Sequence, residues 1–489
     1  MSGLSDVYAL PLGLLTDFYQ LTMAQAYRSQ GLAEAEAVFH LFFRRNPFGG
    51  GFAVACGLER ALDFLESFRY GDADLAYLAT LAGNDGRPLF EQAFLDELGR
   101  IRLALDVDAM PEGTVAFPYE PLVRVRGPLL QAQLVETALL NFVNFETLIA
   151  TKAARVTIAA RGDEVIDFGL RRAQGIDGGL SASRAAFVGG CRGTSNVLAG
   201  RLYGLPVRGT HAHSWVMAFD DESEAFEAWA RAQPNNAMFL VDNYDTLEGV
   251  RRDAKTALGL RSRGHQAIAI RLDSGDLAYL SIEARRILDE AGLPEVKILA
   301  SNDLDEYLIA SLKEQGARID AWGVGTRLVT GGDQSALGGV YKLAALRQPG
   351  GTWRHRVKIS EQVAKTSNPG VQQVRRFGGA EGLVADVIFD EEGGPGDPAV
   401  VVDPLDATRR KRIAPGTPFE DLLVPVVRRG ATVYARPTLP EIQARARAQV
   451  SRLHPGIRRF INPHQYPVGL SVGLYELKTR LVLAARGVS

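Results

Sequence analysis

The chain has 489 residues, of which 46% are hydrophobic and 23% are charged, and its formal net charge is −2. This balance is typical of folded globular proteins, the length exceeds one ordinary domain, and the near-zero charge excludes a general attraction to nucleic acid or to anionic membranes. Only two cysteines, Cys56 and Cys191, are present, which excludes a disulfide framework and a four-cysteine zinc site and favours a reducing compartment.

The sequence indicates no targeting segment. The first 15 residues lack a basic stretch and contain Asp6, unlike a secretory signal. No uncharged apolar run reaches about 18 residues, the length needed to span a membrane. We therefore expect a cytoplasmic protein without a membrane or nucleic-acid partner.

Residues 1–136 are expected to form an N-terminal α+β sheet domain. Apolar spacing predicts helices over 14–30 and 58–68, and an apolar, aromatic run predicts a strand over 37–44. Residues 112–130 combine alternating apolar positions with prolines, which is typical of edge strands in an antiparallel sheet.

Strand-like and helical segments alternate over residues 137–345. A long helix is predicted over 135–156. Apolar runs then end near Thr210, Asp242, Asp273, Asn302 and Thr326, with amphipathic helices between them. Their spacing of roughly 25–30 residues is that of strand–helix–strand units, which indicates a parallel sheet, either open and doubly wound or closed. Polar residues at nearly every strand end favour an irregular, TIM-like α/β barrel, because an open sheet concentrates them at one switch point.

Residues 346–436 contain loops and short strand-like runs, and we expect them to return and complete the N-terminal sheet. Residues 437–489 begin with a proline and are expected to form a C-terminal helical extension. The predicted fold class is therefore α/β, with an irregular barrel, a discontinuous α+β sheet domain and a helical extension.

The polar side chains at the strand ends form the candidate site, because a barrel would bring them to one face. Any one of them alone also suits a helix cap. They are Thr210 with His213, Asp242, Arg271 with Asp273 and Asp276, Ser301 with Asn302, and Gly325 with Thr326.

His211 and His213 allow a second interpretation. A His-x-His pair at a barrel strand end can bind a catalytic metal, as in metal-dependent barrel hydrolases, but such a site needs further ligands at other strand ends. The remaining histidines fall at none of these ends; they are His40, His265, His355, His454 and His464. Of the pair, His211 fits a structural role better than His213.

Glycine-rich and arginine-containing segments offer anion-binding groups. The run over 323–343 presents many backbone amides with Arg327 and Lys342 nearby. Arg171 and Arg172 follow a predicted strand and suit either a phosphate or carboxylate contact or a solvated surface. The P-loop and GxGxxG motifs are missing from the sequence, which disfavours kinase and dehydrogenase functions.

Eight segments together resemble the nicotinate phosphoribosyltransferases and occur in the order typical of that family. They are LLTDFYQLTM (14–23), FFRRNPFGGGFAVACGL (42–58), FGLRRAQGIDGG (168–179), GTSNVLAGRLYGLPVRGTHAHSWV (193–216), VDNYDT (241–246), IRLDSGDL (270–277), SNDLDE (301–306) and WGVGTRLVTGGDQSALGGVYKL (322–343). The match becomes weak beyond about residue 380, so the C-terminal part inherits no role from it.

The resemblance implies the first step of NAD synthesis from nicotinate. Nicotinate and 5-phosphoribosyl 1-diphosphate give nicotinate mononucleotide and diphosphate, with ATP hydrolysis coupled to the reaction. It implies a type II phosphoribosyltransferase architecture and a homodimer with shared active sites. The chemistry calls for Mg²⁺ at the diphosphate, with Asp273 as one candidate ligand.

The resemblance also assigns residues. It implies that His213 is catalytic and becomes phosphorylated, and that Asp242 and Asn302 are catalytic positions. Substrate-binding positions are Tyr19 (from the partner subunit), Thr210 and Arg271 for nicotinate, Arg171 as a further active-site group, and Gly325 and Thr326 for the phosphoribosyl substrate. A nicotinamide-using relative is the nearest alternative, and it has an acidic residue where this chain has His211.

Overall fold

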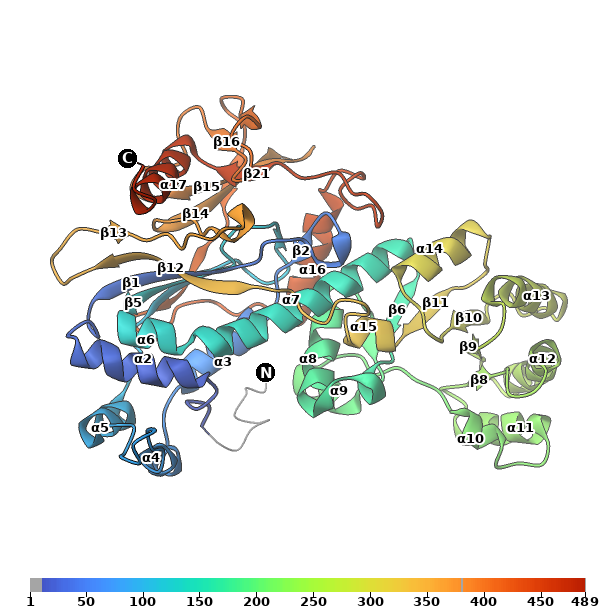
Figure 1. Cartoon of the computed structure of the whole chain (residues 1–489). Coiled ribbons are helices and arrows are strands. Elements are labelled where there is room, and N and C mark those ends of the chain that lie inside the picture. The colour runs from blue at the N-terminus through green and yellow to red at the C-terminus, as the bar shows by residue number, and fades with distance from the viewer. Residues whose placement is uncertain (1–10, 380, 489) are drawn as a thin grey trace. The chain divides into compact units, whose positions relative to one another are not determined.

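The structure is a computed structural model that describes residues 11–379 and 381–488 (Figure 1). The chain divides into two compact units, a larger one of residues 1–148 and 336–489 and a smaller one of residues 149–335. The domain boundaries expected at 136, 345 and 436 stay predictions. The first ten residues, which contain Asp6 and most of the segment tested for a secretory signal, lie outside the described residues. Across the described ranges, no helix combines the length and apolar character needed to cross a bilayer.

The larger unit contains a seven-stranded sheet in the order β13-β12-β1-β5-β3-β19-β20. Its strands are β1 (Glu36–Phe42), β3 (Asp106–Ala109), β5 (Val123–Pro128), β12 (Val340–Arg347), β13 (Arg354–His355), β19 (Val424–Arg428) and β20 (Ala431–Thr432). Strand β1 pairs antiparallel with β5 on one side and with β12 on the other. Segments from before and after the smaller unit therefore build one sheet.

Helices predicted in the first 160 residues are confirmed. They are α2 (Phe18–Ser29), α3 (Leu58–Ser67) and α7 (Glu136–Ala159). Helix α2 begins after Asp17, which forms a capping box with Gln20. It packs on α6 (Leu129–Leu134), which in turn lies against β1 and β5 (Figure 1). Helices α4 (Asp72–Ala79) and α5 (Gln92–Arg100) pack on each other.

A second sheet of the larger unit has the order β17-β16-β21-β15-β14-β18. Its strands are β14 (Gln372–Gly379), β15 (Gly382–Asp390), β16 (Val400–Val402), β17 (Arg410–Arg412), β18 (Phe419–Asp421) and β21 (Val468–Leu470). The C-terminal segment contains the helices α16 (Leu439–Ser451) and α17 (Val472–Ala485), but β21 lies between them and pairs with β15. The expected helical extension thus contains two helices, whereas β21 was not predicted, because three apolar residues are too few to indicate a strand by periodicity.

The smaller unit is built on a parallel sheet in the order β7-β6-β11-β10-β9-β8. Its strands are β6 (Glu164–Asp167), β7 (Gly193–Thr194), β8 (Met238–Leu240), β9 (Ala269–Leu272), β10 (Lys297–Ala300) and β11 (Ala321–Val324). The helices predicted between the later strands are α11 (Glu222–Ala232), α12 (Thr246–Ser262), α13 (Leu277–Glu290) and α14 (Glu306–Glu314). The α/β fold class is confirmed, and the irregular barrel takes the form of a curled, half-barrel sheet (Figure 1).

The strand predicted to end near Thr210 does not form, and only Val207 makes an isolated bridge, to Thr194. Two side chains instead attach this segment to β8. The Thr210 hydroxyl donates to the Met238 carbonyl, and the Leu240 N–H donates to His211 Nε2 over 3.3 Å.

Candidate functional site

Asp242 links the ends of two neighbouring parallel strands. It follows β8, and its Oδ2 accepts hydrogen bonds from the Asp273 backbone N–H over 2.8 Å and from the Ser274 hydroxyl over 2.7 Å. The carboxylate therefore fixes the turn that follows β9. The other oxygen, Oδ1, is buried and has no hydrogen-bond partner among the described residues. A buried oxygen without a partner is rare in folded proteins, and a ligand bound at the site would supply the missing partner.

Arg271, Asp273 and Ser301 form a hydrogen-bonded group at the ends of β9 and β10. Arg271 Nε donates to Ser301 Oγ and Nη2 donates to Asp273 Oδ1, each over 2.7 Å. The Ser301 hydroxyl also donates to Asp273. Burial raises the pKa of Asp273, but Ser301 and Arg271 outweigh burial and hold this pKa below its ordinary value. The carboxylate is thus ionised at neutral pH.

His213 lies on the other side of Asp273. It is the first residue of α10 (His213–Val216), and its Nε2 lies 3.7 Å from Asp273 Oδ2. The His213 side chain is 42% exposed. An accessible imidazole next to an ionised carboxylate can accept a proton or an electrophilic group, because the carboxylate orients the ring and stabilises its positive charge.

His211 has the structural role that its position favoured. Its ring is buried, packs edge-on against Trp229 at 5.0 Å and accepts the Leu240 N–H. Burial lowers the pKa of His211 to about 4, so the ring is neutral at pH 7. Within the part of the chain that the structure describes, the groups of three potential metal ligands are Cys56–Glu112–Glu146 and His355–Asp390–Glu392. Neither includes His211 or His213, so the ligand set expected of a barrel hydrolase does not assemble around this pair.

Asn302 and the glycine-rich segment have unusual backbones. Asn302 is exposed, directly follows Ser301 and has a φ of 109°, a region that non-glycine residues rarely adopt and that is often associated with function. A Cβ on Gly325 would lie 3.3 Å from the Phe168 carbonyl oxygen. Thr326 begins the short helix α15 (Thr326–Val329), and Gly331 and the next glycine then take positive φ angles.

Arg171 lies in the 3-10 helix η2 (Leu170–Arg172), is exposed and has no hydrogen-bond or ion-pair partner in the described chain. Asp167 and Phe168, which precede this segment, were not predicted as site residues from the sequence. Buried Asp167 accepts from the Gly169 N–H, from Ser183 and from Thr194, each over 2.8 Å, and so fixes the loop that carries Arg171. The Phe168 ring lies 5.5 Å from the Arg271 guanidinium. Asp167 could have been predicted from its position, because it is an acidic residue at the end of a predicted strand.

Tyr19 belongs to the larger unit, where it lies on α2 with its side chain 46% exposed. Burial raises the pKa of Tyr19, and the charge of Glu136 adds to the effect.

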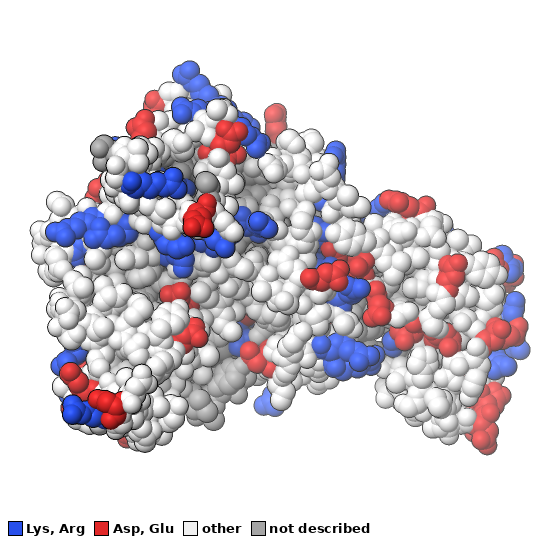
Figure 2. All heavy atoms as spheres, viewed as in Figure 1, with Lys and Arg blue, Asp and Glu red and all other residues white. Residues whose placement is uncertain are grey.

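Lys342 of the larger unit lies near other positive charges. Burial lowers the pKa of Lys342; Glu136 opposes this, whereas the positive charges of Arg44 and Lys358 lower it further. Cations held this close favour an anionic ligand. On the face shown in Figure 2, lysines and arginines gather over β12 and β13, whereas the helices of the smaller unit carry mixed charges.

Comparisons with known proteins agree along the chain. The models of the nicotinate phosphoribosyltransferase (NAPRTase) N-terminal domain, of the NAPRTase family and of the NAPRTase C-terminal domain match residues 14–144, 164–367 and 372–478. The last match corrects the expectation that the resemblance fades beyond about residue 380.

Curated relatives named nicotinate phosphoribosyltransferase extend over nearly the full length. The Bacillus subtilis protein is 42% identical over 96% of this chain and 95% of its own, and the Bos taurus protein is 38% identical over 97% of each. The crystal structure of human nicotinic acid phosphoribosyltransferase superposes with a TM-score of 0.82 at 35% identity, over 95% of this chain and 99% of that one.

Proposed function

Because this chain belongs to the nicotinate phosphoribosyltransferase family, we propose that it joins nicotinate to 5-phosphoribosyl 1-diphosphate and releases nicotinate mononucleotide and diphosphate. The observation that carries this proposal in the structure is the Arg271–Asp273–His213 group at the strand ends. It combines a cation for a carboxylate substrate with an accessible imidazole.

Arg271 is suited to recognise the nicotinate carboxylate. Its Nε and Nη2 are used by Ser301 and Asp273, which hold the guanidinium in place and leave Nη1 for the substrate. A pre-oriented guanidinium binds a carboxylate through charge-assisted hydrogen bonds, which a neutral amide cannot match. Thr210, tied to β8, lies in the segment that leads to His213. This arrangement supports nicotinate over nicotinamide as the substrate.

Departure of diphosphate builds positive charge on the ribose and negative charge on the leaving group. Asp242 and the ionised Asp273 suit the ribose side. The exposed Arg171, the loop at Gly325 and Thr326, and Asn302 are our candidates for the phosphoribosyl substrate.

Mg²⁺ fits the donors at the strand ends. Asp242 Oδ1 is a buried carboxylate oxygen without a hydrogen-bond partner in the described chain, and Asp273 turns its Oδ2 toward His213. Carboxylate oxygens are the ligands Mg²⁺ prefers. When bound there, the ion would supply charge neutralisation for the departing diphosphate.

ATP coupling is assigned to His213. An exposed imidazole beside an ionised carboxylate is a suitable phosphoryl acceptor, and the added negative charge would alter the diphosphate site. Asp273 orients this ring, so the same carboxylate connects phosphorylation to Arg271 and nicotinate.

A homodimer with shared sites is supported by exposed apolar side chains. Phe18 and Tyr19 lie side by side in sequence on α2, and Ile176, Val197 and Leu198 are exposed on α8 (Gly175–Val188) and α9 (Val197–Tyr203). Within each unit, such exposed apolar side chains are suited to contact another chain. We propose that Tyr19 of one subunit contacts the pyridine ring bound by the other.

A cytoplasmic location is part of the same proposal. The buried thiols Cys56 and Cys191 are in keeping with it.

Product formation tests the proposal, with nicotinate and nicotinamide compared in the presence and absence of ATP. We expect nicotinate mononucleotide to form, faster with ATP, and nicotinamide to be a poor substrate. Preference for nicotinamide would contradict the role given to Arg271, and product formation that ATP does not affect would contradict the role given to His213.

A further inference from the structure

His355, Asp390 and Glu392 bring one imidazole and two carboxylates together within the larger unit. One ligand atom from each lies within 4.8 Å of the others. His355 ends β13, Asp390 ends β15, and Glu392 lies in the turn that follows. No hydrogen bond or ion pair joins His355 to either carboxylate, although all three residues are described. His355 Nδ1 is shielded from solvent and has no hydrogen-bond partner among the described residues.

Asp390 is built into this position rather than extended from a flexible loop. It is 8% exposed, and its Oδ1 accepts the Val371 N–H over 2.6 Å. A Cβ on Gly370 would lie 2.5 Å from that oxygen, and Gly370 has a φ of 88°, so only glycine leaves room for the carboxylate. A backbone hydrogen bond of this kind holds a metal-binding carboxylate in its orientation.

Electrostatics at Asp390 also favour a cation. Asp390 and Glu392 bring two carboxylates close together beside the His355 imidazole, and like charges this close repel each other. A bound cation would remove this repulsion.

We propose that His355, Asp390 and Glu392 bind a divalent zinc-type ion, with water in the remaining positions. One imidazole nitrogen and two carboxylate oxygens are typical protein ligands of Zn²⁺, with bonds of about 2.0–2.2 Å. Glu392 is exposed and Asp390 is fixed, so closure of the Glu392 side chain onto the ion would complete the set.

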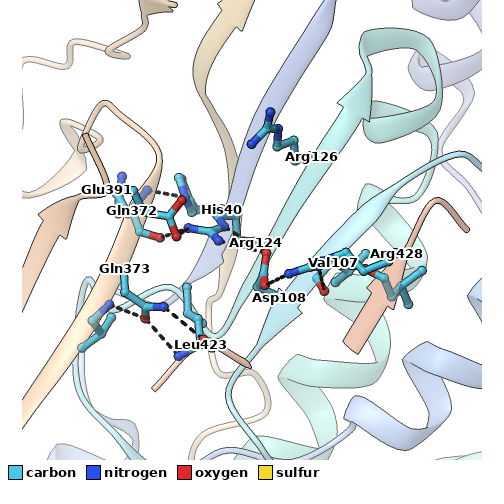
Figure 3. A network of polar contacts seen from close by, with 12 residues as sticks. His40, Val107, Asp108, Arg124, Arg126, Gln372, Gln373, Glu391, Leu423 and Arg428 are labelled. Atoms are coloured by element: carbon cyan, nitrogen blue, oxygen red, sulfur yellow. Dashed lines mark hydrogen bonds and ion pairs between the residues drawn. The ribbon is translucent and has the colours of Figure 1, made fainter. Parts of the chain in front are cut away.

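Such an ion would also affect a neighbouring hydrogen-bond network, because Glu391, which lies between the two acidic ligands, belongs to it. Glu391 accepts from Arg124 Nη1 over 2.7 Å, and Arg124 also bonds the Gln372 carbonyl and Asp108 (Figure 3). Asp108 is bonded by Arg428 in turn. The turn after β15 is thereby tied to β5, β3 and β19. Fixing this turn with a metal would stabilise the contact between the two sheets of the larger unit.

Zinc titration of the full chain without substrates tests the proposal by calorimetry, with cobalt(II) as a spectroscopic probe. We expect His355→Gln and Glu392→Gln to bind one equivalent less than the unsubstituted chain, or to bind it at least tenfold more weakly. The matched control His464→Gln, at an exposed histidine outside the cluster, should bind like the unsubstituted chain. The cobalt absorption band should weaken in the first two variants alone.

Every variant keeps the strand-end groups of the smaller unit, so zinc bound there does not affect the comparison. Circular dichroism establishes that each variant is folded, and Glu392→Gln, at an exposed turn, keeps the test valid if His355→Gln misfolds. The same stoichiometry and affinity in Glu392→Gln and in the unsubstituted chain would overturn the proposal. Because the readout is metal binding, failure here leaves the proposed transferase function untouched.

Discussion

Asp273 Oδ2 lies 3.7 Å from Nε2 of His213, while Oδ1 of the same carboxylate accepts from Arg271 and Ser301. One anion is therefore shared between the cation proposed to bind nicotinate and the imidazole proposed to carry phosphate. A change at Asp273 must affect both groups, whereas a change at His213 leaves the Arg271–Ser301 contact in place.

Asp273→Asn should lower ATP-coupled synthesis by about 100-fold or more, because a neutral amide no longer stabilises a charged His213 or fixes its ring. His213→Ala should abolish ATP hydrolysis while some ATP-independent synthesis survives. The double variant should be no worse in ATP hydrolysis than His213→Ala, since the two residues act as a unit. Steady-state rates with and without ATP measure this, and Asp221→Asn, at the N-terminal cap of α11, is the control. Undiminished ATP hydrolysis in Asp273→Asn would show that Asp273 does not support His213.

Arg271→Ala should reduce kcat/KM for nicotinate by about 10- to 150-fold, because a charged hydrogen bond contributes about 1.5–3 kcal/mol. The loss for nicotinamide should be smaller. Arg271→Lys should not restore nicotinate use fully, because an ammonium cannot contact Ser301, Asp273 and the substrate in one plane. Competition between the two substrates measures the ratio. An equal loss for both would place Arg271 at the phosphoribosyl substrate or in the fold.

The alternation of strands and helices predicted the parallel sheet and most of its strand ends from the sequence, because apolar runs of four residues and capped helices leave clear patterns. Asp242, Arg271 and Asp273 could be found in this way. What the pattern could not show is that Asp273 faces two different groups, since side-chain direction beyond the strand end depends on packing.

Other elements and residues could not be predicted from the sequence, for physical reasons that the structure shows. The strand expected before Thr210 is replaced by two side-chain hydrogen bonds to β8, which leave no periodicity in the sequence. The strand β21 has only three residues, and its pairing with β15 spans a long sequence separation. Asp167 is buried by partners in α8 and β7, and its importance depends on those contacts rather than on its own segment.

Asp253 should make stability depend on pH. It is completely buried in α12, neither carboxylate oxygen has a hydrogen-bond partner in the described chain, and burial raises its pKa well above the ordinary value. The folded protein therefore holds a proton that the unfolded chain releases above its ordinary pKa of about 3.9. The contribution of Asp253 to the free energy of unfolding is fully present below the pKa of the unfolded chain. It is lost as pH rises through the pKa of the folded protein.

Asp253→Leu should raise the free energy of unfolding of the smaller unit by about 1–3 kcal/mol at pH 8, the scale of an unpaired buried polar group. The gain should be smaller at pH 4.5, because the cost of keeping the buried carboxyl protonated in the folded protein falls as pH approaches the ordinary pKa of the unfolded chain. Urea unfolding at both pH values measures it, with Asp289→Leu at the half-exposed end of α13 as the control. A gain that is the same at both pH values would mean that Asp253 does not titrate in this range.

Subunit mixing tests the shared site. Tyr19→Ala and His213→Ala should each be inactive in ATP-coupled synthesis, but a mixed dimer contains one site with Tyr19 from one subunit and His213 from the other. For random reassortment of equal amounts, half the dimers are mixed and one site of each is intact, so roughly a quarter of the activity should return. Mixing each variant with itself is the control, and exchange of labelled subunits must be demonstrated. Exchange without recovered activity would place Tyr19 in the same subunit's site as His213, or outside the site.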